Sequence, residues 1–519
     1  GEGDARIDPV QGWFNWTTNV DYPGMQTDFN PYCRAQGSSL ESLEVIHKWS
    51  HQSTAAQGVS GPLYDSNVDG ALNSSDRHVL IAKNSSRNII AVDANTGEEI
   101  WVSGETVSGR NNSIGALVNL DSDSDAEYIY PHEDSQKLIA LNSDGSTRWI
   151  SEERYANTAG IEIYSGVYPA DLNSDGLAEL LFGSSVFDQN GNRLWGFPQI
   201  PDIDQFAVNG MMLAVDFDLD GTKEVVFNEE VRDWQGDLLW TIPSSGFGRV
   251  WESNFAFANF DGDPNPELVV NSRVGSSTYR LQLIDDDGVL LWDISVSTKS
   301  MITTADFDDD GIPDIYLPGS GTLYRADASI IWSHQRTQNN VGATIADLDA
   351  DGVLDIIQYV DDELFVFDGT TGEISLQWEE YRSQNRLRRM HQVPPSFVDI
   401  DQDGQGELII AGRNSLKVLE AANDDWVPAP PVHAYLNQHR DATRADLTLN
   451  NTIGLALFGQ SSEVASPPLP AGSAARLSDI VLNSVSGNPV DSGWQIKLVA
   501  ANRGLKDIPA GIIVEFYKD

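Results

Sequence analysis

The sequence predicts an all-β protein built as an eight-bladed β-propeller, with seven blades as the alternative, followed by part of an immunoglobulin-like β-sandwich. Three observations lead to this prediction. An acidic nine-residue cassette recurs eight times, short apolar strings and a glycine turn follow it, and each unit ends on a tryptophan. Units of about 40–50 residues with several strands each are typical of propellers, in which radial repetition protects the strand edges.

The composition fits a globular, exported protein. The chain has 519 residues, 40% of them hydrophobic, and a formal net charge of -46. So acidic a chain lacks the basic face of a nucleic-acid binder and the polybasic segment of a protein bound to anionic lipid. It contains no run of 18 apolar residues, so we expect no membrane insertion.

The ends and the thiols indicate where the protein works. The chain starts at Gly1 without a signal-like segment, which we interpret as processing. Cys33 is the only cysteine, so an internal disulfide is excluded. A thiol-poor and strongly acidic chain favours a secreted, extracellular or cell-surface location.

The acidic cassette follows the pattern D-x-D-x-D-G-x-x-[DE]. Successive cassettes start 41 to 54 residues apart. Carboxylates at positions one, three and five of a tight loop converge on one point, the glycine at position six allows a positive φ, and the acid at position nine completes the oxygen shell. Hard cations prefer such ligands, so the sequence predicts Ca²⁺ as the cofactor, with up to eight ions.

The predicted ligands are the acidic and amide residues at these positions in all eight cassettes. They are Asp65, Asn67, Asp69; Asn119, Asp121, Asp123, Glu127; Asp171, Asn173, Asp175, Glu179; Asp216, Asp218, Asp220, Glu224; Asn259, Asp261, Asp263, Glu267; Asp306, Asp308, Asp310, Asp314; Asp347, Asp349, Asp351, Asp355; and Asp399, Asp401, Asp403, Glu407.

Three cassettes depart from the pattern, and we expect them to be weak or empty. The first has Asn67 and Asn73 at acidic positions, the second has Ser124 in the glycine slot, and the fifth has Pro264 there. The ligand positions nevertheless hold 27 of the 78 acidic residues. Eight bound Ca²⁺ would change the net charge from -46 to -30, so about a third of the acidity is explained as metal chemistry.

A tryptophan repeat alternates with the cassettes. Turns such as N-T-G, S-D-G and Q-N-G, which are hairpin signals, precede each tryptophan. Strings such as ELLFGSSV, EVVFNEEV and ELIIAGR are predicted as single strands. The tryptophans are Trp101, Trp149, Trp195, Trp240, Trp292, Trp332, Trp378 and Trp426.

The two ends of the repeat region predict how the ring closes. A ninth tryptophan strand, residues 42–50 with Trp49, precedes the first cassette, while the last unit runs into prolines at DDWVPAPP. Proline cannot serve a central ladder, so we expect residues 42–50 to form the outer strand of the last blade. The alternative is a lone strand lying on the ring.

The cassettes resemble the FG-GAP/VCBS-type repeats of integrin α-like propellers, over residues 42–430. The resemblance implies that each cassette joins the first two strands of a blade and holds one Ca²⁺. The string AVDANTGEEIW (residues 91–101) is also similar to the tryptophan-docking repeat of pyrroloquinoline-quinone dehydrogenases. Those enzymes have a vicinal disulfide that Cys33 alone cannot form, so we interpret this similarity as shared blade packing.

Four segments are predicted: an N-terminal arm at 1–41, the propeller at 42–430, a linker at 431–475 and a partial sandwich at 476–519. The last segment, with Asn502, Arg503, Gly504 and the string GIIVEFY, resembles the start of a bacterial CARDB module. About 100 residues are needed for such a sandwich, so we expect a longer chain or strand addition from a partner.

The functional prediction is a non-enzymatic adhesion or structural scaffold in a larger or multimeric assembly, with a protein partner or self-assembly and a glycan as a further ligand. The alternative is a polysaccharide lyase or glycan-binding propeller, for which His132, Tyr168 and Arg249 are the candidate catalytic cluster. One basic run, with Arg382, Arg386, Arg388 and Arg389, could bind an acidic neighbour or an anionic glycan.

Overall fold

The structure is a computed structural model, and it describes most of the repeat region. The described residues are 6–7, 14–15, 32–34, 44–52, 55–64, 66, 77–106, 115–121, 125–132, 135–155, 166–175, 177–197, 212–243, 251–261, 265–274, 278–308, 310, 312–334, 342–346, 348, 353–360, 363–379, 395–398, 400, 406–411, 415–421, 480–490 and 493–502.

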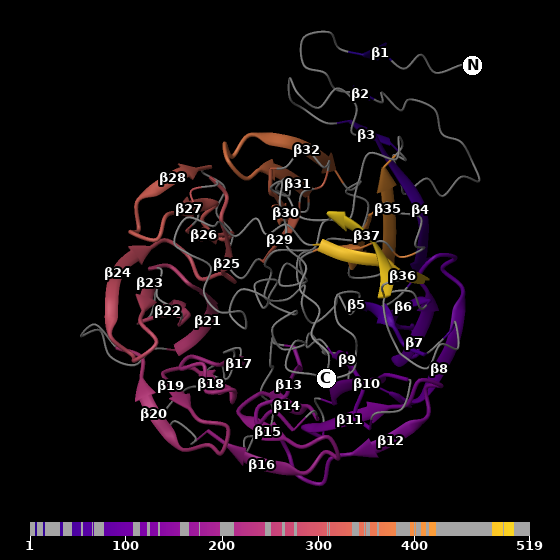
Figure 1. Cartoon of the computed structure of the whole chain (residues 1–519), viewed down its shortest axis with the longest axis horizontal. Helices are drawn as coiled ribbons and strands as arrows, with labels where there is room; N and C mark the ends of the chain where they lie inside the picture. Colours follow the sequence, from indigo (N-terminus) through magenta and orange to yellow (C-terminus); the bar gives the residue numbers. More distant parts are fainter. Residues whose placement is uncertain are drawn as a thin grey trace.

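The chain is all-β, and its sheets surround a common centre in a β-propeller-like ring (Figure 1). Within the described residues there are seven four-stranded antiparallel sheets and one five-stranded sheet, besides two strand pairs. The first three four-stranded sheets comprise β5 (Ala55–Pro62), β6 (His78–Lys83), β7 (Asn88–Asp93) and β8 (Glu99–Thr106); β9 (Ala116–Val118), β10 (Glu127–His132), β11 (Lys137–Leu141) and β12 (Thr147–Ile150); and β13 (Tyr168–Ala170), β14 (Glu179–Phe182), β15 (Ser185–Phe187) and β16 (Arg193–Gly196).

The next four sheets repeat the same order of strands. They comprise β17 (Met212–Val215), β18 (Glu224–Phe227), β19 (Glu230–Arg232) and β20 (Leu238–Thr241); β21 (Trp251–Ala258), β22 (Glu267–Arg273), β23 (Tyr279–Ile284) and β24 (Leu290–Val296); β25 (Thr303–Ala305), β26 (Asp314–Leu317), β27 (Thr322–Tyr324) and β28 (Ile330–Ser333); and β29 (Ala343–Ala346), β30 (Asp355–Val360), β31 (Glu363–Asp368) and β32 (Ile374–Glu379).

The five-stranded sheet joins the two ends of the repeat region. Its strands are β33 (Ser396–Val398), β34 (Glu407–Ala411), β35 (Ser415–Ala421), β4 (Glu44–Gln52) and β3 (Tyr32–Arg34). Trp49 of β4 lies opposite Val418, next to a register shift, as Trp149 lies opposite Ala140 in its own sheet. The predicted pairing of residues 42–50 with the last unit is therefore present, although β3 adds a further strand outside β4.

One prediction about the strands was wrong. ELLFGSSV and EVVFNEEV were expected to be single strands, but each string folds into a tight hairpin, β14–β15 and β18–β19. Gly183 (φ 67°) and Asn228 (φ 53°) supply the left-handed residues of these turns, a conformation that glycine and asparagine adopt readily. With this turn each unit has the four strands expected of a propeller blade, but the second and third strands lie within what was predicted as one strand.

Tryptophans of the outer strands dock onto the hairpin of the next sheet. The indole Nε1 of Trp101 donates to the carbonyl of Ser143 at 2.8 Å, and Trp149 donates to Gln189 at 3.1 Å. Trp195, Trp292 and Trp332 make the corresponding bonds to Trp234, Ala326 and Gly369. In the turns that receive Trp101, Trp149, Trp195 and Trp332 a glycine lies against the indole ring, so that a Cβ on Gly145 (φ 81°) would be 2.6 Å from Trp101. In the turn that receives Trp292, Ala328 (φ 65°) has this place. The tryptophan repeat therefore joins neighbouring sheets.

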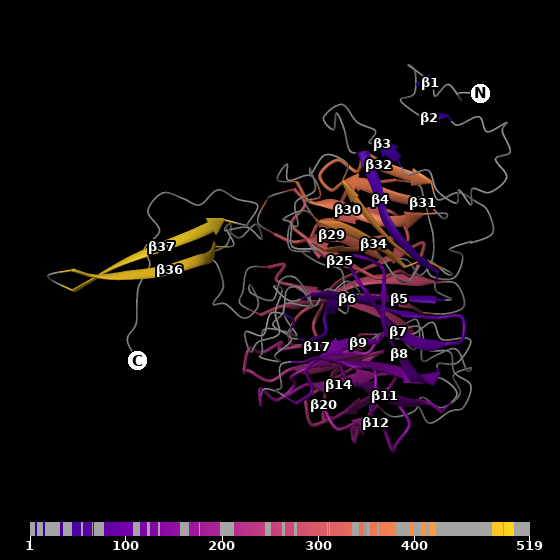
Figure 2. The ribbon, with the colours of Figure 1, turned by 90° about the vertical axis from the view of Figure 1, so that its right-hand side faces the viewer.

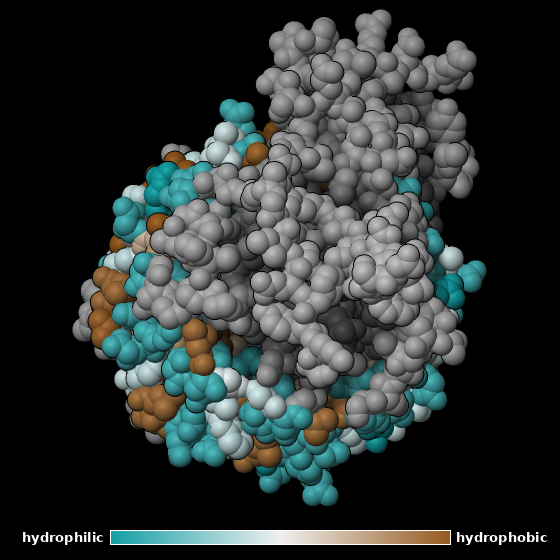
Figure 3. Space-filling view, viewed as in Figure 1, coloured by the Kyte–Doolittle hydropathy of each residue, from teal (hydrophilic) through white to brown (hydrophobic). Residues whose placement is uncertain are grey.

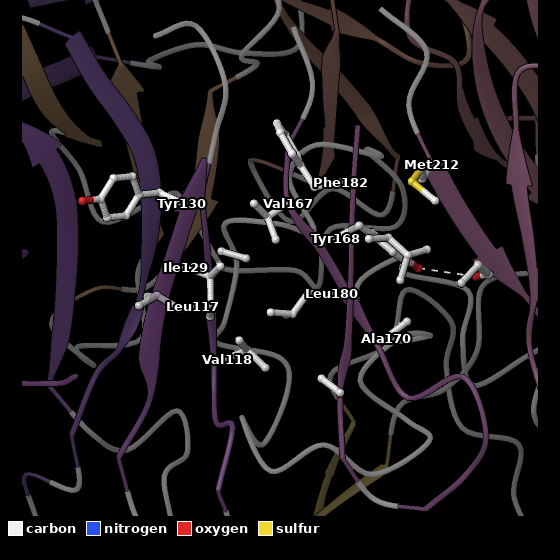
Figure 4. Packing of buried hydrophobic residues seen from close by; sticks show 14 of the residues in the cluster. Leu117, Val118, Ile129, Tyr130, Val167, Tyr168, Ala170, Leu180, Phe182 and Met212 are labelled. Carbon is white, nitrogen blue, oxygen red and sulfur yellow. Dashed lines mark hydrogen bonds between the residues drawn. The ribbon is translucent and has the colours of Figure 1, made fainter. Parts of the chain in front are cut away.

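Apolar side chains from adjacent sheets fill the space between them. Figure 4 shows Leu117 and Ile129 of the second sheet in one cluster with Val167, which directly precedes β13, and with Phe182 of the third sheet, and all four side chains are buried. The outer strands instead expose apolar residues beside the tryptophans, among them Leu194 and Ile330 at 51% and 57%. Figure 3 shows such apolar patches scattered on an otherwise polar rim.

Two further strand pairs lie outside the ring of sheets. β1 (Arg6–Ile7) pairs with β2 (Phe14–Asn15) near the N-terminus, and β36 (Ile480–Val490) pairs with β37 (Gly493–Asn502) as a hairpin that projects to one side (Figure 2). The described residues contain no helix long and apolar enough to cross a bilayer. The predicted linker at 431–475 lies outside the described residues.

Candidate metal centres

Each described cassette connects the first and second strands of its sheet and is held by its ninth residue. That acid opens the second strand, is buried, and accepts a hydrogen bond from the backbone N–H of the second cassette residue. The pairs are Glu127 with Leu120 (2.9 Å), Glu179 with Leu172 (2.9 Å), Glu224 with Phe217 (2.8 Å), Glu267 with Phe260, Asp314 with Phe307 (3.1 Å), Asp355 with Leu348 (3.1 Å) and Glu407 with Ile400 (2.9 Å).

The second residue explains why the loop stays in place. In all seven of these described cassettes it is an apolar side chain buried in the core, for example Leu172 at 1% and Phe307 at 0% exposure. Burial of this side chain anchors the loop, and the carboxylate at position nine satisfies its backbone donor. The alternation of acidic and apolar residues thus separates a face that carries the carboxylates from a face that packs in the core.

Inside the loops, the first and fifth carboxylates hold the turn. The backbone N–H groups of Asp175, Asp220 and Asp310 each donate to the first aspartate of their cassette at 3.1 Å. Gly221, in the predicted glycine slot, has a φ of 93°. Position four is left-handed as well, with Ser174 at 62° and Leu219 at 57°, a feature that the sequence pattern did not reveal.

In two of the described cassettes, three predicted ligands of the same cassette lie close together. Asp216, Asp218 and Glu224 each offer an oxygen within 4.8 Å of the others, and Asp306, Asp308 and Asp314 do the same. These are positions one, three and nine of the fourth and sixth cassettes. A set of carboxylate oxygens at this spacing fits a hard divalent cation such as Ca²⁺.

A third group contains a residue that sequence reasoning missed. Asp261 and Glu267 of the fifth cassette gather with Asp285, which opens the D-D-D-G turn after β23. In a four-stranded meander the first and third turns lie at the same sheet edge, so the outer hairpin reaches the cassette. Three consecutive aspartates, Asp285, Asp286 and Asp287, form a further group. This run in the sequence could have indicated an additional acidic site.

Burial changes the protonation of the position-nine acids. Desolvation, with a smaller contribution from neighbouring cassette aspartates, raises the pKa of Glu179 to about 7 and that of Glu224 to about 8. The pKa of Asp314 is raised to about 8 for the same reasons. A bound cation would oppose these shifts, because an adjacent positive charge favours the ionised carboxylate.

The other cassettes are brought together less completely. Asp171, Asn173, Asp175 and Glu179 all lie in the third loop, but they form no three-carboxylate group at the spacing above. The fifth residues Asp220 and Asp310 are described but belong to no such group either, and Asn119 and Asn259 are described at position one of their loops. Outside the described residues lie Asp65, Asn67, Asp69, Asp123, Asp263, Asp347, Asp349, Asp351, Asp399, Asp401 and Asp403.

Basic side chains enter several described cassettes, and none was anticipated. Lys48 of β4 donates to Glu407 of the eighth cassette at 3.4 Å, and Arg325 donates to Asp308 of the sixth at 2.6 Å. Arg148 of β12 donates to Asp121 at 2.7 Å and to Glu127 at 3.3 Å in the second cassette. Lys223, at position eight of the fourth cassette, is buried and donates to the carbonyl of Asp171 in the third at 2.8 Å. Burial lowers the pKa of Lys223, while Asp171, Asp216 and Glu179 oppose this shift. Lys223 is the only basic residue in the eight cassette sequences, and this could have indicated a basic side chain among the carboxylates.

The candidate catalytic cluster is engaged in local contacts. His132 Nδ1 lies 2.9 Å from the hydroxyl of Ser135 in its own hairpin, and Tyr168 is buried with its hydroxyl 3.5 Å from the carbonyl of Ala214 (Figure 4). Arg249 and the basic run at Arg382, Arg386, Arg388 and Arg389 lie outside the described residues.

Comparison with known proteins supports the fold. The chain is similar to the V. cholerae biofilm matrix protein Bap1, with 16% identity, a TM-score of 0.56, and coverage of 75% of this chain and 93% of that one. The chain is also similar to a rhamnogalacturonan lyase from Bacillus licheniformis, with 15% identity, a TM-score of 0.48, and coverage of 85% of this chain and 82% of that one. BamB from Moraxella catarrhalis has 16% identity, a TM-score of 0.43, and coverage of 72% of this chain and 99% of its own. Neither a protein-family model nor a curated protein matches the chain.

Proposed function

We propose that this protein is a calcium-stabilised, extracellular β-propeller of eight blades that serves as a surface adhesion or structural scaffold. One observation carries the proposal: the buried acid at position nine is held in the same way in seven described cassettes, in one sheet after another. A feature repeated in all seven of these described cassettes suits a structural role of the metal. Catalysis, by contrast, needs one site.

Each cassette joins two strands that pair next to each other, so a bound cation would brace the edge of its own sheet. The acidic groups of the fourth, fifth and sixth sheets are the best-supported sites, because three carboxylates already approach within 4.8 Å there. Metal binding to the native state alone stabilises it by mass action. The test is the melting temperature in Ca²⁺ and in EGTA, and equal values would refute the role of calcium.

The scaffold role is supported by the fold and by surface chemistry. Bap1, which shares the fold, is described as a biofilm matrix protein, and an external matrix suits a chain of net charge -46 with one cysteine. The C-terminal hairpin β36–β37 is a pair of long strands, and a two-stranded hairpin needs a partner strand or surface for independent stability. We therefore propose that residues 476–519 belong to a sandwich completed by more chain or by another subunit.

Two experiments separate this proposal from the lyase or glycan-binding alternative. Light scattering should find assembly that is lost when residues 476–519 are removed or when Arg382, Arg386, Arg388 and Arg389 are replaced by Ser. Supplying polyuronates should produce no unsaturated-product absorbance. Monomeric behaviour of the full chain together with lyase products would overturn the scaffold proposal in favour of the enzyme.

A further inference from the structure

In the second cassette one basic side chain bridges two of the predicted ligands, whereas Arg325 in the sixth pairs with Asp308 and Lys48 in the eighth pairs with Glu407. The guanidinium of Arg148 bridges Asp121 and Glu127, which are positions three and nine of the predicted calcium loop. Glu127 is buried at 2% side-chain exposure, and Arg148 itself is 26% exposed. A buried carboxylate requires a compensating positive charge, and arginine supplies it with directional hydrogen bonds.

Arg148 reaches the cassette because of the sheet topology. The cassette joins β9 to β10, and Arg148 lies in β12 directly after the turn that follows β11. In an antiparallel meander these two connections lie at the same edge. A further bond, from the hydroxyl of Ser143 to Asp125 at 2.6 Å, ties the same turn to the same cassette.

The fifth and sixth sheets place different residues at this edge. In the fifth sheet the outer turn contributes Asp285, which adds a negative charge to its acidic group. In the sixth sheet Arg325 contacts Asp308 alone at 2.6 Å, with its side chain 42% exposed, and Asp306, Asp308 and Asp314 remain within 4.8 Å of one another. Only in the second sheet, among these three, does one guanidinium bridge positions three and nine.

We infer that Arg148 is the built-in cation of the second cassette, so that this loop is closed by an arginine in place of Ca²⁺. The inference rests on the proposed function, in which the remaining intact cassettes hold Ca²⁺. The sequence of this loop agrees with it, since Asn119 replaces an acid at position one and Ser124 replaces the glycine. One sheet of the ring is then independent of calcium.

Native mass spectrometry at saturating Ca²⁺ tests the inference by counting bound ions. The double variant Arg148→Ser/Ser124→Gly should hold one ion more than the wild type, because the cassette regains its glycine and loses its competitor. Arg325→Ser is the matched control and should hold the wild-type number, as should Ser124→Gly alone. An equal count in the double variant and the wild type would overturn the inference, and so would an extra ion in Ser124→Gly alone.

Thermal melting provides a readout that is independent of the ion count. In EGTA, Arg148→Ser should melt several degrees below Arg325→Ser, since it leaves Glu127 buried without its counter-charge. Equal melting temperatures of these two variants would contradict the inference. A wild type that binds no Ca²⁺ at all would refute the proposed function instead, and would leave the role of Arg148 to be decided by melting alone.

Discussion

Replacing Gly145 by alanine should break the contact that joins the first two sheets of the repeat. Gly145 has a φ of 81°, where an alanine costs about 1–2 kcal/mol. Its new Cβ would also lie 2.6 Å from Cε3 and 2.7 Å from Cδ2 of Trp101, so the indole would have to move. Overpacking of this kind costs about 1–3 kcal/mol. Together we expect a loss of about 2–5 kcal/mol in the free energy of unfolding.

The indole position also controls a hydrogen bond. Trp101 Nε1 donates to the carbonyl of Ser143 in the same turn at 2.8 Å, so a displaced ring weakens this bond as well. Denaturant unfolding at saturating Ca²⁺, followed by tryptophan fluorescence, measures the total effect. The midpoint should fall clearly below that of the wild type, because cooperative unfolding of the ring depends on contacts between sheets.

Two control variants divide the effect into its parts. At Gly104 a Cβ would meet no heavy atom within 4 Å, so Gly104→Ala should be neutral or slightly stabilising. Ala328 occupies the corresponding hairpin turn of another sheet with a φ of 65°, so Ala328→Gly should stabilise the protein by about 1 kcal/mol. If Gly145→Ala unfolds at the same midpoint as Gly104→Ala, the docking of tryptophan on glycine is not a stabilising contact.

Three further changes test the metal centres and the contacts between sheets. Glu224→Gln should leave the melting temperature in EGTA unchanged or higher, because a neutral amide replaces a buried carboxyl whose pKa is raised to about 8, but should lower it in Ca²⁺; a loss of equal size in both would argue against a metal at this loop. Lys223→Met removes a buried cation close to Asp171 and should raise Ca²⁺ affinity several-fold by calorimetry, while unchanged affinity would mean that the amine does not compete with the ions. Trp149→Phe loses the bond to Gln189 and should destabilise by about 1 kcal/mol in denaturant unfolding, with a neutral result counting against that bond.

Much of the fold could be read from local pattern. The spacing of cassettes and tryptophans predicts repeated antiparallel sheets, and the pairing of β4 with β35 agrees with the strand predicted at residues 42–50. The hairpin within ELLFGSSV could not be read in this way. Its two strands are only four and three residues long, and the turn between them is the dipeptide Gly183-Ser184, a short signal inside a string that was assigned to one strand.

The candidate centres were predictable only in part. Positions one, three and nine of a cassette are close in sequence, so Asp216, Asp218 and Glu224 were found from their spacing alone. Asp285 lies in the third connection of its sheet, 18 residues beyond Glu267. Arg148 lies in β12, just after the third connection of its sheet and 21 residues beyond Glu127. Such contacts depend on which edge of the sheet each turn occupies.

The repeat and its acidic loops were predictable from the chain alone, because they depend on residue spacing within one unit. The tertiary structure decided how the loops differ from one another. Folding brings an aspartate to the fifth cassette, an arginine across the carboxylates of the second, and a buried lysine between the third and fourth. The charge around an acidic loop is a sum over neighbours in space, so no pattern along the chain could assign it.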